Sequence, residues 1–136
     1  MNQEWQRLWF RLQTRPCTSL AVLGTEHGSD AGRVTMTLAA IGNRDGQVPV
    51  RVISAIGASF ADVPRILGQL SQAAAEHSRT LVPCDSLQSN PATIPILHAS
   101  AGVILIVRLG DSMLESMKTT VELVGRDRVM ATITVG

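Results

Sequence analysis

Residues 24–35, GTEHGSDAGRVT, combine glycines with a histidine, an aspartate and an arginine. They follow the apolar run SLAVL and lead into the helix-like segment MTLAAIG. A glycine-bearing turn between a strand and a helix is where nucleotide-binding proteins hold phosphate, because the helix N-terminus directs backbone N–H groups at the anion. His27, Gly28 and Arg33 therefore form a candidate site for a nucleotide phosphate or another anion.

Asp85 is a further candidate ligand-binding residue, because it directly follows the apolar run TLVPC. Open α/β folds bind ligands at the carboxyl ends of their strands, which is where Asp85 would meet the loop around His27. An aspartate at the end of a strand also serves as a turn or helix cap. Both interpretations stay open at this point.

Metal and nucleophile chemistry has little support in the sequence. The three histidines have spacings that match no helix-borne or turn-borne pair of metal ligands. The two cysteines, Cys17 and Cys84, make neither a disulfide framework nor a four-ligand zinc site, and we expect free, buried thiols. The chain also lacks the Gly-x-Ser-x-Gly of hydrolases and the Gly-x-Gly-x-x-Gly of dinucleotide-binding proteins. We expect no metal and no cofactor.

Length, charge and hydropathy limit the class of protein. With 136 residues and a net charge of +1, the sequence predicts one domain over 1–136 and no clustered basic surface for nucleic acid. The longest apolar stretch, Val103 to Val107, is far shorter than the roughly 20 residues that span a bilayer. The first residues also lack the apolar core of a signal peptide. We expect a cytoplasmic protein with no direct membrane insertion.

The elements that would position these residues alternate along the chain. Apolar runs rich in Val, Ile and Leu alternate with helical periods, and continuous apolar runs are typical of parallel strands covered on both faces. The pattern predicts a three-layer α/β/α sandwich around a mostly parallel five-stranded sheet. The expected strands are Ser19–Leu23, Val50–Ser54, Thr80–Cys84, Gly102–Leu109 and Val129–Val135.

Capping signals mark two of the expected helices. Ser59 and Asp62 precede one apolar helical pattern. Ser112 and Glu115 form a capping box before a second pattern, which Gly125 ends. Each helix would connect two neighbouring strands of the sequence.

The N-terminal segment predicts an amphipathic helix over about residues 3–13. Apolar residues recur there at three- and four-residue intervals and form one face, while charged residues form the other. The apolar face would either cover the domain's own core or dock on another subunit, and both alternatives stay open. In the second case we expect an interface made by Glu4, Trp5, Arg7, Leu8, Trp9 and Arg11.

The final third, GVILIVRLGDSMLESMKTTVELVGRDRVMATITV, resembles the closing strand, helix and strand of the P-loop tyrosine kinases and related ATPases of bacterial exopolysaccharide biosynthesis. That family has an N-terminal Glu-x-x-Arg-x-x-Arg helix, a Pro-Gly-Glu-Gly-Lys-Ser/Thr loop and a third strand that ends in aspartate. Glu4 and Arg7 match the helix motif, with Arg11 one residue late, and Asp85 matches the strand end. The resemblance covers nearly the whole chain and implies a P-loop NTPase-like (Rossmann-like) fold.

The loop departs from that family at the residues that perform phosphoryl transfer. A phosphate-binding loop needs a lysine for the β- and γ-phosphates and a hydroxyl for Mg²⁺. With Gly28 on the first loop glycine, the positions of the second glycine, the lysine and the hydroxyl fall on Asp30, Ala31 and Gly32. A register shifted by two residues supplies Arg33 as a cation but no hydroxyl.

Two further departures from the family pattern also indicate the loss of kinase chemistry. The family's second strand ends in Asp-x-Asp, whereas RVISAIGASF offers Ser54 and Ser59 and no carboxylate before Asp62. Those kinases phosphorylate a tyrosine-rich tail, and this chain contains no tyrosine. Autophosphorylation on tyrosine is therefore excluded for this sequence.

The resemblance implies a degenerate P-loop-like protein, without nucleotide chemistry, that acts as an interaction or regulatory subunit in bacterial exopolysaccharide biosynthesis or export. The implied partners are further copies of the chain, or the membrane polysaccharide chain-length regulator that the resembling ATPases engage. The alternative is a nucleotide- or anion-binding sensor, or a weak ATPase, whose altered loop binds through His27, Gly28, Arg33 and Asp85.

Overall fold

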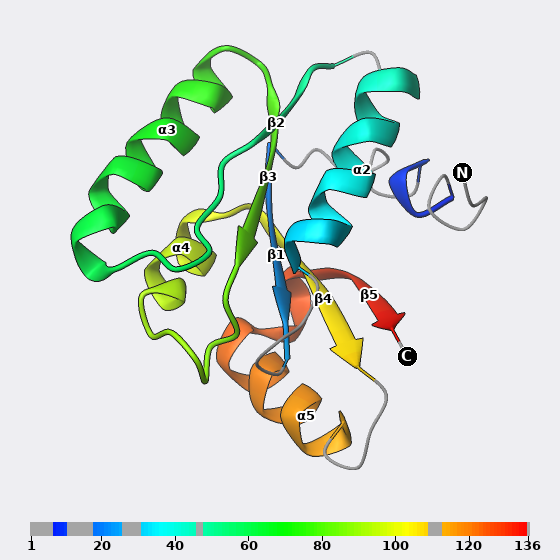
Figure 1. Cartoon of the computed structure of the whole chain (residues 1–136), viewed down its shortest axis with the longest axis vertical. Coiled ribbons are helices and arrows are strands. Elements are labelled where there is room, and N and C mark those ends of the chain that lie inside the picture. Colours follow the sequence, from blue (N-terminus) through cyan, green and yellow to red (C-terminus); the bar gives the residue numbers. More distant parts are fainter. Residues whose placement is uncertain (1–6, 11–17, 26–30, 46–47, 109–112, 136) are drawn as a thin grey trace.

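Five strands form one sheet in the computed structural model of the chain (Figure 1). The structure describes residues 7–10, 18–25, 31–45, 48–108 and 113–135. The strand order is β2-β3-β1-β4-β5, so the first strand of the sequence lies at the centre of the sheet. The strands are β1 (Ser19–Gly24), β2 (Val50–Val52), β3 (Arg79–Cys84), β4 (Gly102–Arg108) and β5 (Val129–Val135).

All four strand pairings are parallel. In the centre, Leu20 of β1 lies beside Leu81 of β3 on one side and beside Gly102 of β4 on the other. Parallel neighbours require a crossover between them, and here the helices provide it. The strands therefore all end at the same edge, which we call the carboxyl edge, and the arrowheads in Figure 1 point to it.

Helices cover both faces of the sheet, as predicted (Figure 1). On one face α2 and the helical turn at 7–10 pack over Val22 and Ile104. On the other face three helices pack over Leu23 and Leu105. The helices are α2 (Ala31–Asp45), α3 (Val63–Ala75), α4 (Thr93–Ala99) and α5 (Met113–Val124). In the described part of the chain, no helix has the length and apolar character needed to cross a bilayer.

The central strands explain why the sequence predicts this architecture. Every residue of β1 is buried, and so is every residue of β4 except Arg108. Such strands face hydrophobic layers on both sides, so their sequences are continuously apolar rather than alternating. The three-layer α/β/α prediction is confirmed, and the sheet is wholly parallel.

The largest differences from the prediction are the end of the second strand and one additional helix. The second strand ends at Val52 rather than at Ser54, although the N–H groups of Ile53 and Ala55 still bond to β3. The sequence patterns do not predict α4, because two prolines lie within or beside this short segment. Pro95 is tolerated there because it lies in the first turn, where a backbone N–H has no partner inside the helix.

The structure describes the predicted cap before α3 and the predicted stop after α5. A short 3-10 helix, η1 (Phe60–Asp62), precedes α3, and the Asp62 carboxylate accepts hydrogen bonds from the Ser59 backbone N–H at 2.9 Å and from its hydroxyl at 3.1 Å. These bonds, the backbone one foremost, lower the pKa of Asp62. Ser112 lies outside the described residues. Gly125, with φ of 95°, follows the last residue of α5, as the predicted stop requires.

Candidate functional site

Asp85 fastens two loops together at the carboxyl edge. Its carboxylate accepts a hydrogen bond from the Gly57 backbone N–H at 2.8 Å and another from the Asn90 amide at 3.0 Å. Gly57 has φ of 73°, a conformation that other residues adopt at a cost, in the turn between β2 and α3. Asp85 is half-buried, and because of these two hydrogen bonds it acts as a turn cap in this structure.

Asn90 completes this connection between the loops. Its side-chain amide also donates to the carbonyl of Ala58 at 2.8 Å, and its side-chain oxygen accepts from the N–H of Ala92 at 3.1 Å. Thr93 donates its hydroxyl to the Asp85 carbonyl at 3.1 Å. We call Asp85, Asn90 and the Gly57 N–H the Asp85 clamp. It holds the loop after β2 against the loop after β3.

The segment Ser54–Ala55–Ile56 follows β2 and contains no carboxylate. Ala55 forms an isolated parallel bridge with Cys84, which places this segment at the carboxyl edge beside β3. The Ser54 hydroxyl accepts a hydrogen bond from the Ile56 N–H at 3.3 Å. Ile56 is about half exposed. Ser54 thus makes a local turn contact and Ile56 presents a hydrocarbon side chain, so this segment offers no carboxylate to a metal ion.

Ile56 packs against the first turn of α2. A Cβ atom built on Gly32 would lie 3.3 Å from Cδ1 of Ile56. In the predicted loop register with Gly28 on the first glycine, Gly32 is at the position of the hydroxyl-bearing residue. A hydroxyl-bearing side chain at this position would meet a methyl group, where Mg²⁺ needs oxygen ligands.

The four residues of the predicted anion site are described only in part. Arg33 lies in the first turn of α2 with an exposed side chain, so it belongs to the helix and not to the preceding turn. Asp85 belongs to the clamp described above. His27 and Gly28 lie outside the described residues. The structure therefore places one cation near the start of α2 and engages the aspartate in loop contacts.

Trp9, a member of the predicted N-terminal interface, lies inside the domain. It is only 3% exposed and belongs to the hydrophobic cluster under α2, with Leu8 half-buried against the same cluster. Gly42 gives it room, since a Cβ there would come within 2.4 Å of the indole ring. The guanidinium of Arg79 lies 5.7 Å from the ring centre, a cation–π arrangement.

Trp9 thus covers the domain's own core, and the interface stays a prediction. Arg7 and Phe10, on the same helical turn, are exposed. The remaining members of the predicted interface, Glu4, Trp5 and Arg11, lie outside the described residues. The described part of this segment therefore favours the alternative in which the helix caps its own domain.

Cys84 is the described cysteine, and it is free and buried, as expected. Burial raises the pKa of its thiol to about 12, and the adjacent Asp85 carboxylate adds to the increase. Such a thiol is almost wholly protonated at neutral pH and therefore a poor nucleophile. Among the described residues no group of three or more His, Cys, Asp or Glu side chains could hold a metal ion.

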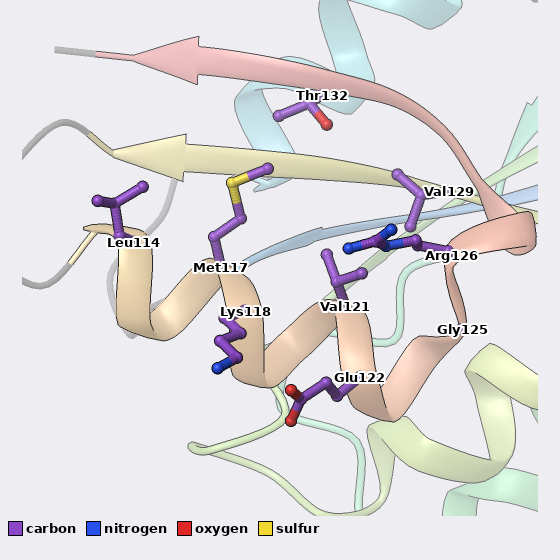
Figure 2. A pocket seen from close by; sticks show the side chains of 9 residues that line it. All are labelled: Leu114, Met117, Lys118, Val121, Glu122, Gly125, Arg126, Val129 and Thr132. Atoms are coloured by element: carbon purple, nitrogen blue, oxygen red, sulfur yellow. The ribbon is translucent and has the colours of Figure 1, made fainter.

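Sequence reasoning missed two features of this edge and one elsewhere. The contact between Gly32 and Ile56 and the clamp partners Gly57 and Asn90 join segments that are distant in sequence. An Asn-Pro pair after Asp85 was the available signal for a structured turn. The third feature is a groove between α5 and β5 (Figure 2).

The order of the strands and the helices on both faces define a three-layer α/β/α fold around a wholly parallel sheet. Among solved structures, the chain is similar to one described as the BceF tyrosine kinase domain, with a TM-score of 0.70 and 12% sequence identity over 97% of this chain and 74% of that chain. At this identity the likeness shows the fold alone. No protein-family model and no curated protein sequence matches the chain.

Proposed function

We propose that this protein is a P-loop-like domain that does not transfer phosphoryl groups and acts as an interaction or regulatory subunit in bacterial exopolysaccharide biosynthesis or export. The likeness of its fold to a tyrosine kinase domain supports the scaffold. The sequence resemblance to the exopolysaccharide kinases supports the setting. The proposed partners are the membrane polysaccharide chain-length regulator and further copies of the chain.

The contact between Ile56 and Gly32 carries the proposal. Phosphoryl transfer on such a scaffold depends on a Mg²⁺ ion held by a loop hydroxyl and by acids at a strand end. With Gly28 on the first loop glycine, the hydroxyl position falls on Gly32, and Ile56 from the loop after β2 packs against it. Restoring a hydroxyl at Gly32 would still leave the segment after β2 without a carboxylate before Asp62.

The Asp85 clamp supports the same conclusion. Oδ2 of Asp85 accepts from a backbone N–H and from a side-chain amide of its own chain, which gives this carboxylate a structural role. Releasing it would leave the Asn90–Ala58 hydrogen bond as the remaining side-chain contact described between the loops after β2 and β3. Asp62, the acid described in the next turn after Ile56, is engaged in the cap of the 3-10 helix.

Nucleotide binding is the first test. We expect Mg²⁺ and ATP or GTP at millimolar concentration to leave the melting temperature unchanged and to yield no phosphate release. A ligand at about 100 times its dissociation constant would add about 2.7 kcal/mol, or roughly 5 °C or more. A shift without Mg²⁺ that Arg33→Ala abolishes would favour the alternative function, an anion or nucleotide sensor. Turnover that survives further purification would contradict the proposal.

Genetic complementation tests the setting. Deletion of the gene should lower surface polysaccharide, and the wild-type gene should restore it. A variant that combines Arg33→Ala with Asp85→Asn should restore it equally if it accumulates to the same level, because the proposed function uses no chemistry at this edge. Loss of complementation by a stable variant would contradict the proposal. Co-purification with the chain-length regulator of the same cell then tests the partner.

A further inference from the structure

Two buried hydrogen-bond donors lie on the α2 face of the sheet without an acceptor. They are Nε1 of the Trp9 indole and Nη1 of the Arg79 guanidinium. In the part of the chain that the structure describes, no group accepts a hydrogen bond from either nitrogen. A donor that leaves water without gaining a partner destabilises the folded state, so proteins almost always provide one. Two such donors at one place indicate a site for an acceptor group.

Both donors lie where the strands begin, at the edge of the sheet that we call the amino edge. Arg79 is the first residue of β3 and pairs with Val50, the first residue of β2. Figure 1 shows the helical turn at 7–10, to which Trp9 belongs, beside α2. The guanidinium carbon of Arg79 lies 5.7 Å from the centre of the Trp9 ring, so the two donors belong to neighbouring groups. The candidate site is therefore at the opposite edge from the Asp85 clamp.

The charge of Arg79 selects the kind of acceptor. A guanidinium stays protonated in proteins, and a buried arginine is normally paired with an acid. Arg79 forms no ion pair with any acid that the structure describes. Glu76, the acid nearest to it in sequence, instead accepts hydrogen bonds from Arg51 and Gln72, which lower its pKa. The described residues thus leave a positive charge at this site without a counterion.

We propose that the indole N–H of Trp9 and the guanidinium of Arg79 bind one small oxyanion, a carboxylate or a phosphate group. An oxyanion supplies the negative charge that balances Arg79, and its oxygens can accept from both donors. A water molecule could accept the same hydrogen bonds, but it would leave the guanidinium without a counterion. An anion therefore fits this pair of donors better than water does.

The surroundings of the indole hold its N–H in a fixed direction. Trp9 is only 3% exposed, and Gly42 makes room for the ring, because a Cβ there would lie 2.8 Å from Cε2, the carbon bonded to Nε1. Donors that are already in place lose little conformational freedom when a ligand binds. Arg79 is half-buried, so the site borders solvent on its side and an anion has access to it.

The inference goes beyond the proposed function, because this site shares no residue with the carboxyl edge. Its test is an NMR titration of the full chain with sodium phosphate and, separately, with sodium acetate, at constant ionic strength and neutral pH. The indole N–H signal that disappears in Trp9→Phe belongs to Trp9, and in the wild type this signal should move to a saturating position. Saturation with acetate identifies a carboxylate ligand, and saturation with phosphate alone identifies a phosphorylated one.

Substitutions at the two donors connect the response to this site. Arg79→Met removes the charge and should weaken anion binding at least about tenfold, whereas Arg79→Lys keeps the charge and should lose less. Trp9→Phe keeps an aromatic ring without the N–H and should weaken binding by about threefold to tenfold, measured by the rise in melting temperature that the anion produces. Arg65→Met, at an exposed arginine of α3, is the matched control and should leave the affinity unchanged.

Two results would overturn the inference. An indole signal that stays fixed up to the highest concentration of both anions would show that water alone serves the donors. A response that Arg79→Met leaves intact would place the anion elsewhere on the molecule. Binding of either anion that Arg79→Met abolishes and Arg65→Met preserves would support the site at the amino edge.

Discussion

The carboxylate of Asp85 lies 2.8 Å from the backbone nitrogen of Gly57, so the residue that ends β3 holds the turn that follows β2. The sequence separation of 28 residues makes this a tertiary contact and not a local cap. Asn90 donates to the same carboxylate oxygen, so one side chain contacts both loops. The clamp gives Asp85 a structural role at the carboxyl edge, where open α/β folds bind their ligands.

Asp85→Ala should lower the free energy of unfolding by about 2 kcal/mol, because it leaves the Gly57 N–H and the Asn90 amide without their acceptor. Asp85→Asn keeps an acceptor oxygen and should cost less. Urea unfolding measures both. The exposed Asp127→Ala is the matched control and should change stability by no more than about 0.5 kcal/mol. Equal stability of Asp85→Ala and wild type would disprove the clamp.

Gly42→Ala should destabilise the protein by about 2 kcal/mol, although alanine favours helices, because its Cβ would overlap the Trp9 ring and come within 2.7 Å of Val50. Gly68 is the matched control within α3, where a Cβ meets nothing within 4 Å. Gly68→Ala should therefore stabilise by roughly 0.5–1 kcal/mol. Thermal or urea unfolding of the two variants should show opposite signs.

Trp9→Ala should cost about 3–5 kcal/mol, as expected for a large side chain removed from a core. It should leave the oligomeric mass of the folded protein unchanged, since Trp9 faces α2 and not the surface. In a Trp9→Leu background the penalty of Gly42→Ala should shrink, because the ring that it strikes is gone. A Trp9→Ala variant of normal stability and reduced mass would instead favour an interface at the N-terminal turn.

The Cys84 thiol should make stability fall at alkaline pH. Its pKa is raised from 9.0 in the unfolded chain to about 12 in the folded one, so the unfolded state loses its proton first. The contribution is complete below pH 9 and is lost as the pH rises toward 12, by up to roughly 1 kcal/mol per pH unit. Urea unfolding between pH 8 and about pH 10.5 should show a steeper decline for wild type than for Cys84→Ala. Parallel curves would contradict this assignment.

Repairing the loop should not create an ATPase. The triple substitution Asp30→Gly, Ala31→Lys and Gly32→Thr restores the family motif in sequence, but the new threonine would crowd Ile56. The acids at the end of the second strand would also still be missing. We expect no phosphate release above that of the wild type, measured at equal purity. Hydrolysis by the triple variant would show that the loop alone was limiting.

The sheet could be predicted from the sequence because its central strands are apolar along their whole length. The stretches LAVL and VILIV are apolar at every position, which indicates strands buried on both faces. This signal can be read from a short stretch of sequence alone. The short helix α4 could not be predicted in this way. Pro95 is compatible with a helix only in its first turn, and nothing local fixes where that turn begins.

The candidate site was predictable in position but not in its contacts. Asp85 could be placed at the end of a strand, whereas its partner Gly57 comes from a loop on another connection. For Trp9, helical periodicity gives an apolar face without saying what the face covers. Gly42, a glycine inside the pattern AAIGN, marks the surface that receives the ring, but only the fold brings the two together.

The central position of β1 has a consequence during synthesis of the chain. Both strands that neighbour β1 come later in the sequence, because Leu20 pairs with Leu81 of β3 and with Gly102 of β4. Until both strands exist, an apolar segment near the N-terminus emerges from the ribosome without either partner. Sheets built from pairings that are distant in sequence fold slowly and populate aggregation-prone intermediates. We therefore expect the newly made chain to depend on chaperones until β4 has been synthesised, and its yield to fall when translation outpaces them.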